Sequence, residues 1–274
     1  MRYSAQRFLA LILLWLAVGV VPAAAATLSA DEIINKTYRV DGGQDGISRL
    51  TFTFHKPDTP EKKLTFSMVW KEYGGEGDIS SKVLFFSEFP PDERGKSFMA
   101  WIYKDRMDDH WVYLPELRMV RKVSHGAHMR KHDDDDFALS VLTRGDLVPR
   151  KPEVDRHALL GEEEIKGKAY YLVESTPKQA SDTYPYQKVR RWISKDEFLV
   201  ERIDYYGAGP VPEKQQEIKW ERRGNAWVWS RVSGLQAKNG ARTLLEISDI
   251  RVNLGLKDDV FSARSLRLGI ESLQ

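Results

Sequence analysis

The sequence contains no cysteine, so disulfide bridges cannot stabilise the fold. It also lacks a basic excess, because 42 Lys and Arg residues stand against 40 Asp and Glu residues, and two of the cations are Arg2 and Arg7. A protein that neutralises nucleic-acid phosphates would carry a clear surplus of positive charge. Nucleic acid is therefore not expected as a partner, and the fold must depend on its own hydrophobic core.

A long hydrophobic run is found only at the N-terminus. Arg2 and Arg7 precede an apolar stretch from Phe8 to Val21, and the small residues Ala24 to Ala26 follow it. This order is typical of a secretory signal peptide and predicts cleavage after Ala26. A retained anchor is the alternative, but a spanning helix needs roughly 20 apolar residues. No cysteine follows the small residues, so the exported chain is expected to carry no lipid anchor.

Period-two alternation dominates the rest of the chain. In residues 49–56, Leu50, Phe52 and Phe54 alternate with polar residues, and residues 63–73 repeat this pattern. Such alternation indicates strands with one apolar and one polar face. About eleven short strands, joined by Gly-, Asn- and Asp-containing turns, predict a mainly β protein with an antiparallel meander, closed or nearly closed. There is no fixed-period repeat and no Pro- or Ser-rich linker, so residues 27–274 are expected to form a single domain.

Helical signals are few. Ser29 is followed three residues later by Glu32, which is the spacing of a capping box, and Ile33, Ile34 and Tyr38 offer an apolar face. A weaker candidate helix covers residues 133–147, where a run of aspartates precedes apolar residues.

Three segments together resemble the outer-membrane lipoprotein-sorting proteins of the LolA-like superfamily. "LSADEIINKTYRV" (28–40) matches that family's opening amphipathic helix, and "DDHWVYLPELRMVRKVS" (108–124) is similar to its tryptophan-x-tyrosine-leucine-proline strand and the arginine-rich strand after it. "ISDIRVNLGLKDDVFSARSL" (247–266) is similar to its terminal strand, turn and asp-x-phe segment. The resemblance implies a single, unclosed antiparallel β-barrel with one or two helices covering its opening.

The resemblance also implies a function: a periplasmic carrier that moves lipid or lipoprotein cargo from the inner toward the outer membrane. An inner-membrane transporter and an outer-membrane acceptor would be its partners. Such a carrier needs an apolar cavity rather than covalent chemistry, so we expect no enzymatic activity, catalytic residue, cofactor or metal. Two alternatives stay open: an accessory binding subunit of an inner-membrane lipid transporter, and a metal-dependent enzyme.

Under the carrier hypothesis, inward-facing aromatic and aliphatic side chains line the cavity. The inner face is assigned from alternation alone, and a one-residue bulge would reverse it. The residues expected to line the cavity are Phe52, Phe54, Phe66, Met68, Trp70, Trp101, Trp111 and Tyr113.

A group of cations, Arg118, Arg121 and Lys122, follows the tryptophan-containing strand. Charge runs of this kind are usually a solvated hairpin face. The functional alternative is a rim that meets lipid headgroups or an acidic patch on a membrane transporter.

The segment His125–Asp136 contains three histidines followed by four aspartates. On a helix, His125, His128 and His132 would share one face and could bind a metal. However, the pattern matches neither a recognisable zinc motif nor an EF-hand loop. We interpret the segment as a charged loop, and the enzyme hypothesis would require it to bind metal instead.

Overall fold

The computed structural model describes residues 28–75, 77–123, 140–143, 146–148, 150–180 and 184–273. Thirteen antiparallel strands form one sheet that does not close, which confirms the predicted fold class. The strands are β1 (Asp45–His55), β2 (Lys62–Glu72), β3 (Ile79–Phe89), β4 (Ser97–Tyr103), β5 (Asp109–Leu114), β6 (Met119–Val123), β7 (Asp155–Ile165), β8 (Lys168–Pro177), β9 (Lys188–Ser194), β10 (Val200–Tyr206), β11 (Lys214–Arg223), β12 (Ala226–Gln236) and β13 (Arg242–Val252). The helices are α1 (Ala30–Tyr38) and α3 (Ala263–Leu268), with 3₁₀ turns η1 (Pro115–Leu117), η3 (Pro152–Val154), η4 (Asp258–Val260) and η5 (Ile270–Leu273).

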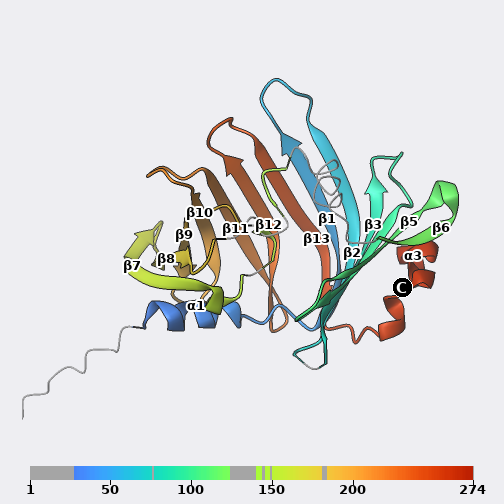
Figure 1. The fold of residues 1–274 in the computed structure, drawn as a ribbon, viewed down its shortest axis with the longest axis horizontal. Coiled ribbons are helices and arrows are strands. Elements are labelled where there is room, and N and C mark those ends of the chain that lie inside the picture. Colours follow the sequence, from blue (N-terminus) through green and yellow to red (C-terminus); the bar gives the residue numbers. More distant parts are fainter. Residues whose placement is uncertain are drawn as a thin grey trace, which may run out of the picture.

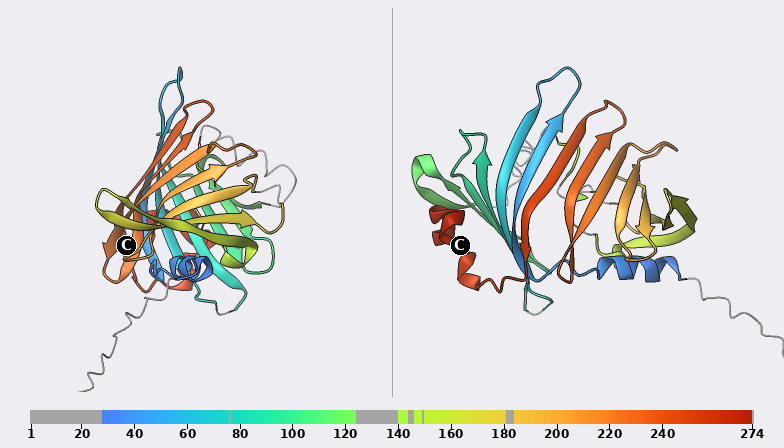
Figure 2. Two further views of the ribbon diagram at one scale, coloured as in Figure 1. Left: turned by 90° about the vertical axis from the view of Figure 1, so that its left-hand side faces the viewer. Right: turned by 180° about the vertical axis from the view of Figure 1, so that it is seen from behind.

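The sheet consists of two meanders that meet at its centre. Strands β1 to β6 run outward from the centre in chain order, and strands β7 to β13 run back from the opposite edge. The first and last strands, β1 and β13, pair with each other through residues 46–55 and 242–252. Strands β6 and β7 are consequently the two edges, at opposite ends of the curved sheet (Figure 1). Figure 2 shows how strongly the sheet curls between them.

The sequence predicts about eleven strands where the structure has thirteen, and its alternation does not reveal the edge strand β7. The pairing of β7 with β8 shifts between Leu159 and Gly161, and three consecutive glutamates, 162–164, follow the shift. A bulge of this kind interrupts the alternation on which the prediction depends.

Helix α1 begins as the sequence predicts. The Ser29 hydroxyl accepts a hydrogen bond from the Glu32 backbone N–H, and the Glu32 carboxylate accepts one from the Ser29 backbone N–H, so both halves of the capping box form. Ile33 and Ile34 are buried against the sheet, whereas Tyr38 is 46% exposed and does not join them. We call the sheet face that packs against α1, and that carries Phe52 and Phe54, the inner face.

The inner face is also covered by the chain segment that crosses from β6 to β7. Leu142 belongs to the same buried cluster as α1, and its side chain lies against Gly234 of β12. The Val141 backbone N–H donates to the hydroxyl of Thr243 on β13, at 2.8 Å. The described residues 140–143 are not helical, so this part of the second candidate helix does not form.

The opposite, outer face of β1 to β6 has its own apolar cluster. Ile47, Val69 and Leu84 are buried there together with Phe261 and Leu266 of the C-terminal segment. Helix α3 contacts β4, β5 and β6, and Figure 1 shows it at the far end of the sheet from α1. The two termini therefore pack at opposite ends of the sheet, with α1 on the inner face and α3 on the outer face.

Among the described residues, none of the helices has the length and apolar character needed to cross a membrane. The predicted signal peptide, residues 1–26, and the segment His125–Asp136 lie outside the described residues.

Candidate ligand-binding face

The eight residues predicted to line a cavity divide between the two faces of the sheet. Five of them share the inner face: Phe52, Phe54, Phe66, Met68 and Trp70. The other three, Trp101, Trp111 and Tyr113, pack against the outer cluster beside α3. The division follows from the register, which pairs Phe85 with Phe98 on the inner face and Leu84 with Met99 on the outer face.

An aromatic row crosses the inner face from the centre of the sheet toward the β6 edge. It consists of Phe52, Phe66, Phe85, Phe98 and His110, one from each of five adjacent strands. Successive ring centroids lie 6.3, 6.4, 6.2 and 5.5 Å apart. Phe52 is buried in the core, whereas Phe66, Phe85 and Phe98 are only partly buried. The row thus extends from the buried core toward the β6 edge, and its partly exposed rings form a surface on which apolar groups can bind.

The alternation in the sequence does not identify Phe85, Phe98 or His110 as members of this row. Phe85 stands in the run Leu84-Phe85-Phe86, which is apolar on both faces, so alternation cannot assign it. The signal that identifies these residues is the register between strands, which the sequence does not contain.

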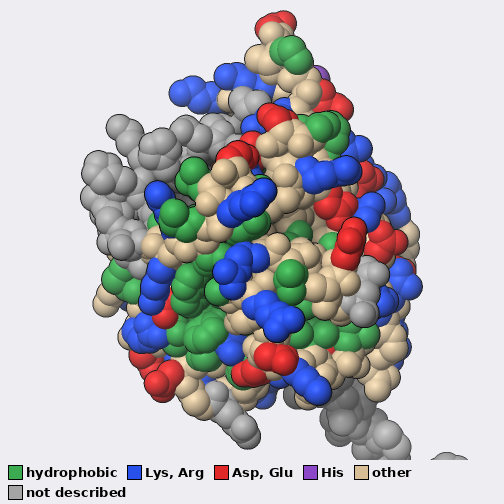
Figure 3. Space-filling view, turned by 90° about the vertical axis from the view of Figure 1, so that its right-hand side faces the viewer, with side chains coloured by type: hydrophobic (Ala, Val, Ile, Leu, Met, Phe, Trp, Pro, Cys, Tyr) green, Lys and Arg blue, Asp and Glu red, His purple; other side chains and the backbone are tan. Residues whose placement is uncertain are grey.

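The predicted cations lie on or next to the edge strand β6 and point in different directions. Arg118 follows η1 in the left-handed region, with φ of 47°, and is exposed. Arg121 pairs with Val112 on the inner face, whereas Lys122 pairs with Trp111 on the outer face. The Lys122 ammonium lies 2.7 Å from a carboxylate oxygen of Asp109. Viewed from the side of β5, β6 and α3, patches of hydrophobic side chains are bordered by Lys and Arg (Figure 3).

A groove opens in the other half of the sheet, where β10 and β11 separate. Their pairing ends at Arg202 and Glu217, so the remainder of β11 pairs only with β12. The groove has a volume of about 430 Å³, within the range of roughly 300–1,000 Å³ that is usual for small-molecule sites. Its apolar floor is Leu199, Ile218, Trp220 and Trp227.

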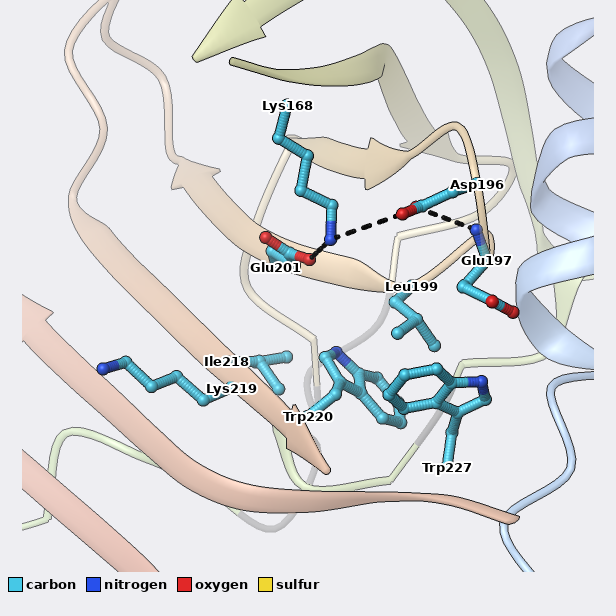
Figure 4. A pocket seen from close by; sticks show the side chains of 9 residues that line it. All are labelled: Lys168, Asp196, Glu197, Leu199, Glu201, Ile218, Lys219, Trp220 and Trp227. Atoms are coloured by element: carbon cyan, nitrogen blue, oxygen red, sulfur yellow. Dashed lines mark hydrogen bonds and ion pairs between the residues drawn. The ribbon is translucent and has the colours of Figure 1, made fainter. Parts of the chain in front are cut away.

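Charged side chains stand along one side of this groove (Figure 4). The Lys168 ammonium lies 2.5 Å from Glu201 and 3.9 Å from Asp196. Tyr170 donates to the second oxygen of Glu201 at 2.6 Å, and burial together with this hydrogen bond raises the pKa of Tyr170. The groove can therefore bind an apolar group on its floor. At its rim, the Lys168 ammonium is already paired with the carboxylates of Glu201 and Asp196.

A buried ion pair fixes the crossing segment to the inner face. The Lys214 ammonium on β11 lies 2.5 Å from the carboxylate of Asp146, and both side chains are at most 2% exposed. Gln216 donates to the Asp146 backbone carbonyl at 3.3 Å, and Tyr205 donates to Gln216 at 2.6 Å. Burial lowers the pKa of Lys214, and the attraction of Asp146 opposes that shift.

Side chains with catalytic potential are few among the described residues. His157 and Ser175 lie 2.7 Å apart, but Ser175 is 1% exposed and also accepts a hydrogen bond from Arg191, so a substrate cannot reach its hydroxyl. The described part of the chain holds no group of three or more His, Asp or Glu side chains placed to bind a metal. The predicted candidates His125, His128 and His132 lie outside that part.

Comparison with solved structures confirms the resemblance at the level of the fold. The chain is 26% identical to a DUF1329 family protein from Desulfovibrio piger, with a TM-score of 0.71 over 86% of this chain and 97% of that protein. It is 22% identical to an outer membrane lipoprotein-sorting protein domain from Vibrio parahaemolyticus, with a TM-score of 0.69 over 87% and 98%. A LolA superfamily protein from Nitrosomonas europaea is 19% identical, with a TM-score of 0.59 over 87% and 100%.

No curated protein matches the sequence. A protein family described as "Uncharacterized protein" matches residues 80–268, which is more than half of the chain. That range runs from β3 to α3 and includes most of the aromatic row and the whole groove. The protein belongs to this family, and its open thirteen-stranded sheet is the fold of the LolA-like lipoprotein-sorting proteins.

Proposed function

We propose that the protein is a carrier that binds the acyl chains of lipids or lipoproteins on its inner face. The observation that carries this proposal is the aromatic row, whose members Phe66 and Phe85 pack against the core while staying partly exposed. Covering such a face with an apolar chain is favourable, and each buried methylene contributes about 0.8 kcal/mol to the free energy of binding. Ten methylenes would contribute on the order of 8 kcal/mol before the entropy of ordering the ligand is subtracted.

The groove between β10 and β11 supports the same proposal. Its floor residues Ile218 and Trp220 belong to the inner-face core or pack against it. The row and the groove, which are both partly open apolar regions, thus adjoin one core, against which α1, Leu142 and Leu147 pack.

We infer the cellular role from the leader-like sequence at the N-terminus together with the fold. The chain is proposed to work in the periplasm and to move its cargo from the inner toward the outer membrane, between a transporter and an acceptor. The solved structures that share this fold include an outer membrane lipoprotein-sorting protein domain, which supports a carrier rather than an enzyme.

The proposal is tested by asking which face binds a neutral acyl probe. Phe98 on the inner face and Tyr113 on the outer face are partly buried aromatic residues on adjacent strands, so Phe98→Ala and Tyr113→Ala form a matched pair. We expect Phe98→Ala to weaken the binding of cis-parinaric acid methyl ester by roughly tenfold, as fluorescence titration would measure it. Tyr113→Ala should leave this affinity unchanged.

Native mass spectrometry of the purified protein, followed by organic extraction, provides an independent readout. We expect an acyl-bearing molecule in stoichiometric amount.

In the fluorescence titration, the absence of probe binding in the wild-type protein, or a greater loss of affinity with Tyr113→Ala than with Phe98→Ala, would contradict the proposal.

A further inference from the structure

Arg121 lies at the end of an apolar ladder that crosses the inner face. The register pairs Met68 with Phe85, Phe85 with Phe98, Phe98 with Val112, and Val112 with Arg121. Directly opposed residues on adjacent strands share one face, and the strands stand about 4.8 Å apart. Arg121 is therefore on the order of 14 Å from Phe85 along a line of side chains that are all apolar.

The guanidinium of Arg121 has no carboxylate partner among the described residues. The residue is exposed, and its Nε donates to the sulfur of Met119 at 3.3 Å. Its neighbour Lys122, on the outer face, is paired with Asp109, and Lys214, on the inner face, is paired with Asp146. A guanidinium without a carboxylate partner among the described residues, next to an apolar surface, can donate two hydrogen bonds to an anionic group in bidentate geometry.

We infer that the inner face binds a single-chain anionic amphiphile, with its tail along the Met68–Phe85–Phe98–Val112 ladder and its headgroup at Arg121. This inference rests on the proposed function and names the class of ligand for the same face. The headgroup is a carboxylate or a phosphate, because both match the planar donor pair of a guanidinium. Its position on the edge strand leaves the headgroup in water while the tail is buried, so the charge is not desolvated.

The test compares two probes with the same acyl chain, one with an anionic carboxylate and one with a neutral methyl ester. Wild-type protein is titrated with cis-parinaric acid and with its methyl ester, and the titrations are repeated with Arg121→Gln, Arg121→Lys and Lys122→Gln. We expect wild type to bind the acid more tightly than the ester, by roughly threefold to tenfold. Arg121→Gln should abolish this preference while its affinity for the ester stays unchanged, and Arg121→Lys should retain part of the preference.

Lys122→Gln is the matched control, because it removes a cation one residue away on the outer face. Competition by lysophosphatidic acid and by lauric acid then distinguishes a phosphate from a carboxylate headgroup, and inorganic phosphate tests whether the tail is required. Equal binding of acid and ester by wild type, or equal effects of Arg121→Gln and Lys122→Gln, would overturn the inference and leave the carrier proposal standing. Failure of both probes to bind would overturn both.

Discussion

Asp258 is the carboxylate that fixes the C-terminal segment to the outer face. It accepts hydrogen bonds from Lys71 at 2.8 Å, from Tyr73 at 3.0 Å and from Lys82 at 3.2 Å. The Lys82 ammonium is almost fully buried and also lies over the Trp101 ring, 4.3 Å from its centroid. The hydrogen bond from Lys71, followed by those from Lys82 and Tyr73, lowers the pKa of Asp258 from 3.8 to about 2 despite partial burial.

The first residue-scale prediction concerns Asp258→Asn. The substitution leaves the buried Lys82 ammonium without its carboxylate, and we expect a loss of about 1 kcal/mol in the free energy of unfolding at neutral pH. The value lies at the low end for such a loss because the Asp258 side chain is 56% exposed and water screens the pair. Urea denaturation of the wild-type and Asp258→Asn proteins measures this loss in the free energy of unfolding.

The pH dependence gives this prediction a second readout. Because the pKa of Asp258 is lower in the folded state than its ordinary 3.8, its contribution is complete above that value. The contribution disappears as the pH falls from 3.8 toward 2, so the wild-type and Asp258→Asn proteins should converge in that interval. Asp259→Asn, the control, should match wild type throughout, because Asp259 is exposed and, unlike Asp258, has no hydrogen-bonded cation among the described residues. A difference that persists unchanged at pH 2 would contradict the assignment.

The need for glycine at position 46 arises from residues that are distant in the sequence. The sequence around it, "DGGQDG", indicates a turn, yet Gly46 lies within β1. A Cβ atom at this position would lie 2.3 Å from the Trp70 ring and 2.4 Å from the Arg251 carbonyl oxygen. The glycine is required because Trp70 lies across the strand, and only the pairing of β1 with β2 reveals that requirement.

Among the elements, α1 is positioned by signals that are local in sequence. Its nine residues carry a complete capping box, two acidic residues in the first turn and Lys36 in the last turn. This charge order complements the helix dipole. Its contacts with β7 and η3, by contrast, depend on segments more than 100 residues away.

The element-scale prediction is that the cap determines how firmly α1 covers the inner face. Ser29→Ala removes the hydroxyl that accepts from Glu32, and we expect a loss of about 1 kcal/mol in the free energy of unfolding. Ser29→Asp retains an acceptor at the N-cap and should remain close to wild type. Urea denaturation of the three proteins compares them, and equal losses for both variants would show that the cap does not act through its acceptor oxygen.

At the scale of the whole molecule, the strand pair β1–β13 joins the two halves of the sheet. Phe52 of β1 pairs with Leu245 of β13, which in turn pairs with Val232 of β12, and all three are buried. The inner-face core therefore extends without interruption from one meander into the other.

We predict that the two halves unfold together. The described tryptophans occupy both meanders, so their fluorescence reports on both, and the far-UV circular dichroism reports on the whole sheet. The two signals should share one urea midpoint, since the junction is part of the core rather than a linker. Phe52→Ala should lower the free energy of unfolding by about 3–5 kcal/mol, and the urea midpoint should fall equally for both signals. Two separate transitions would contradict this prediction.

The sequence by itself determined the features that depend on near neighbours along the chain. These are the alternation of Phe52, Phe66 and Met68 on one face, the capping box at Ser29, the absence of disulfides and the antiparallel class of the sheet. The alternation and the capping box follow from the geometry of a strand or a helix over a few residues, the antiparallel class follows from the short turns between strands, and the missing disulfides follow from the lack of cysteine.

The tertiary structure alone decided which strands are neighbours and which chain segment covers each face. Trp101, Trp111 and Tyr113 fit a strand pattern on either face, and they lie on the outer face because α3 covers apolar residues there. Likewise, the line from Met68 to Arg121 exists only once five strands are set in register. Alternation fixes the two faces of each strand but not how one strand is oriented relative to the next, so a site built across strands follows only from their pairing.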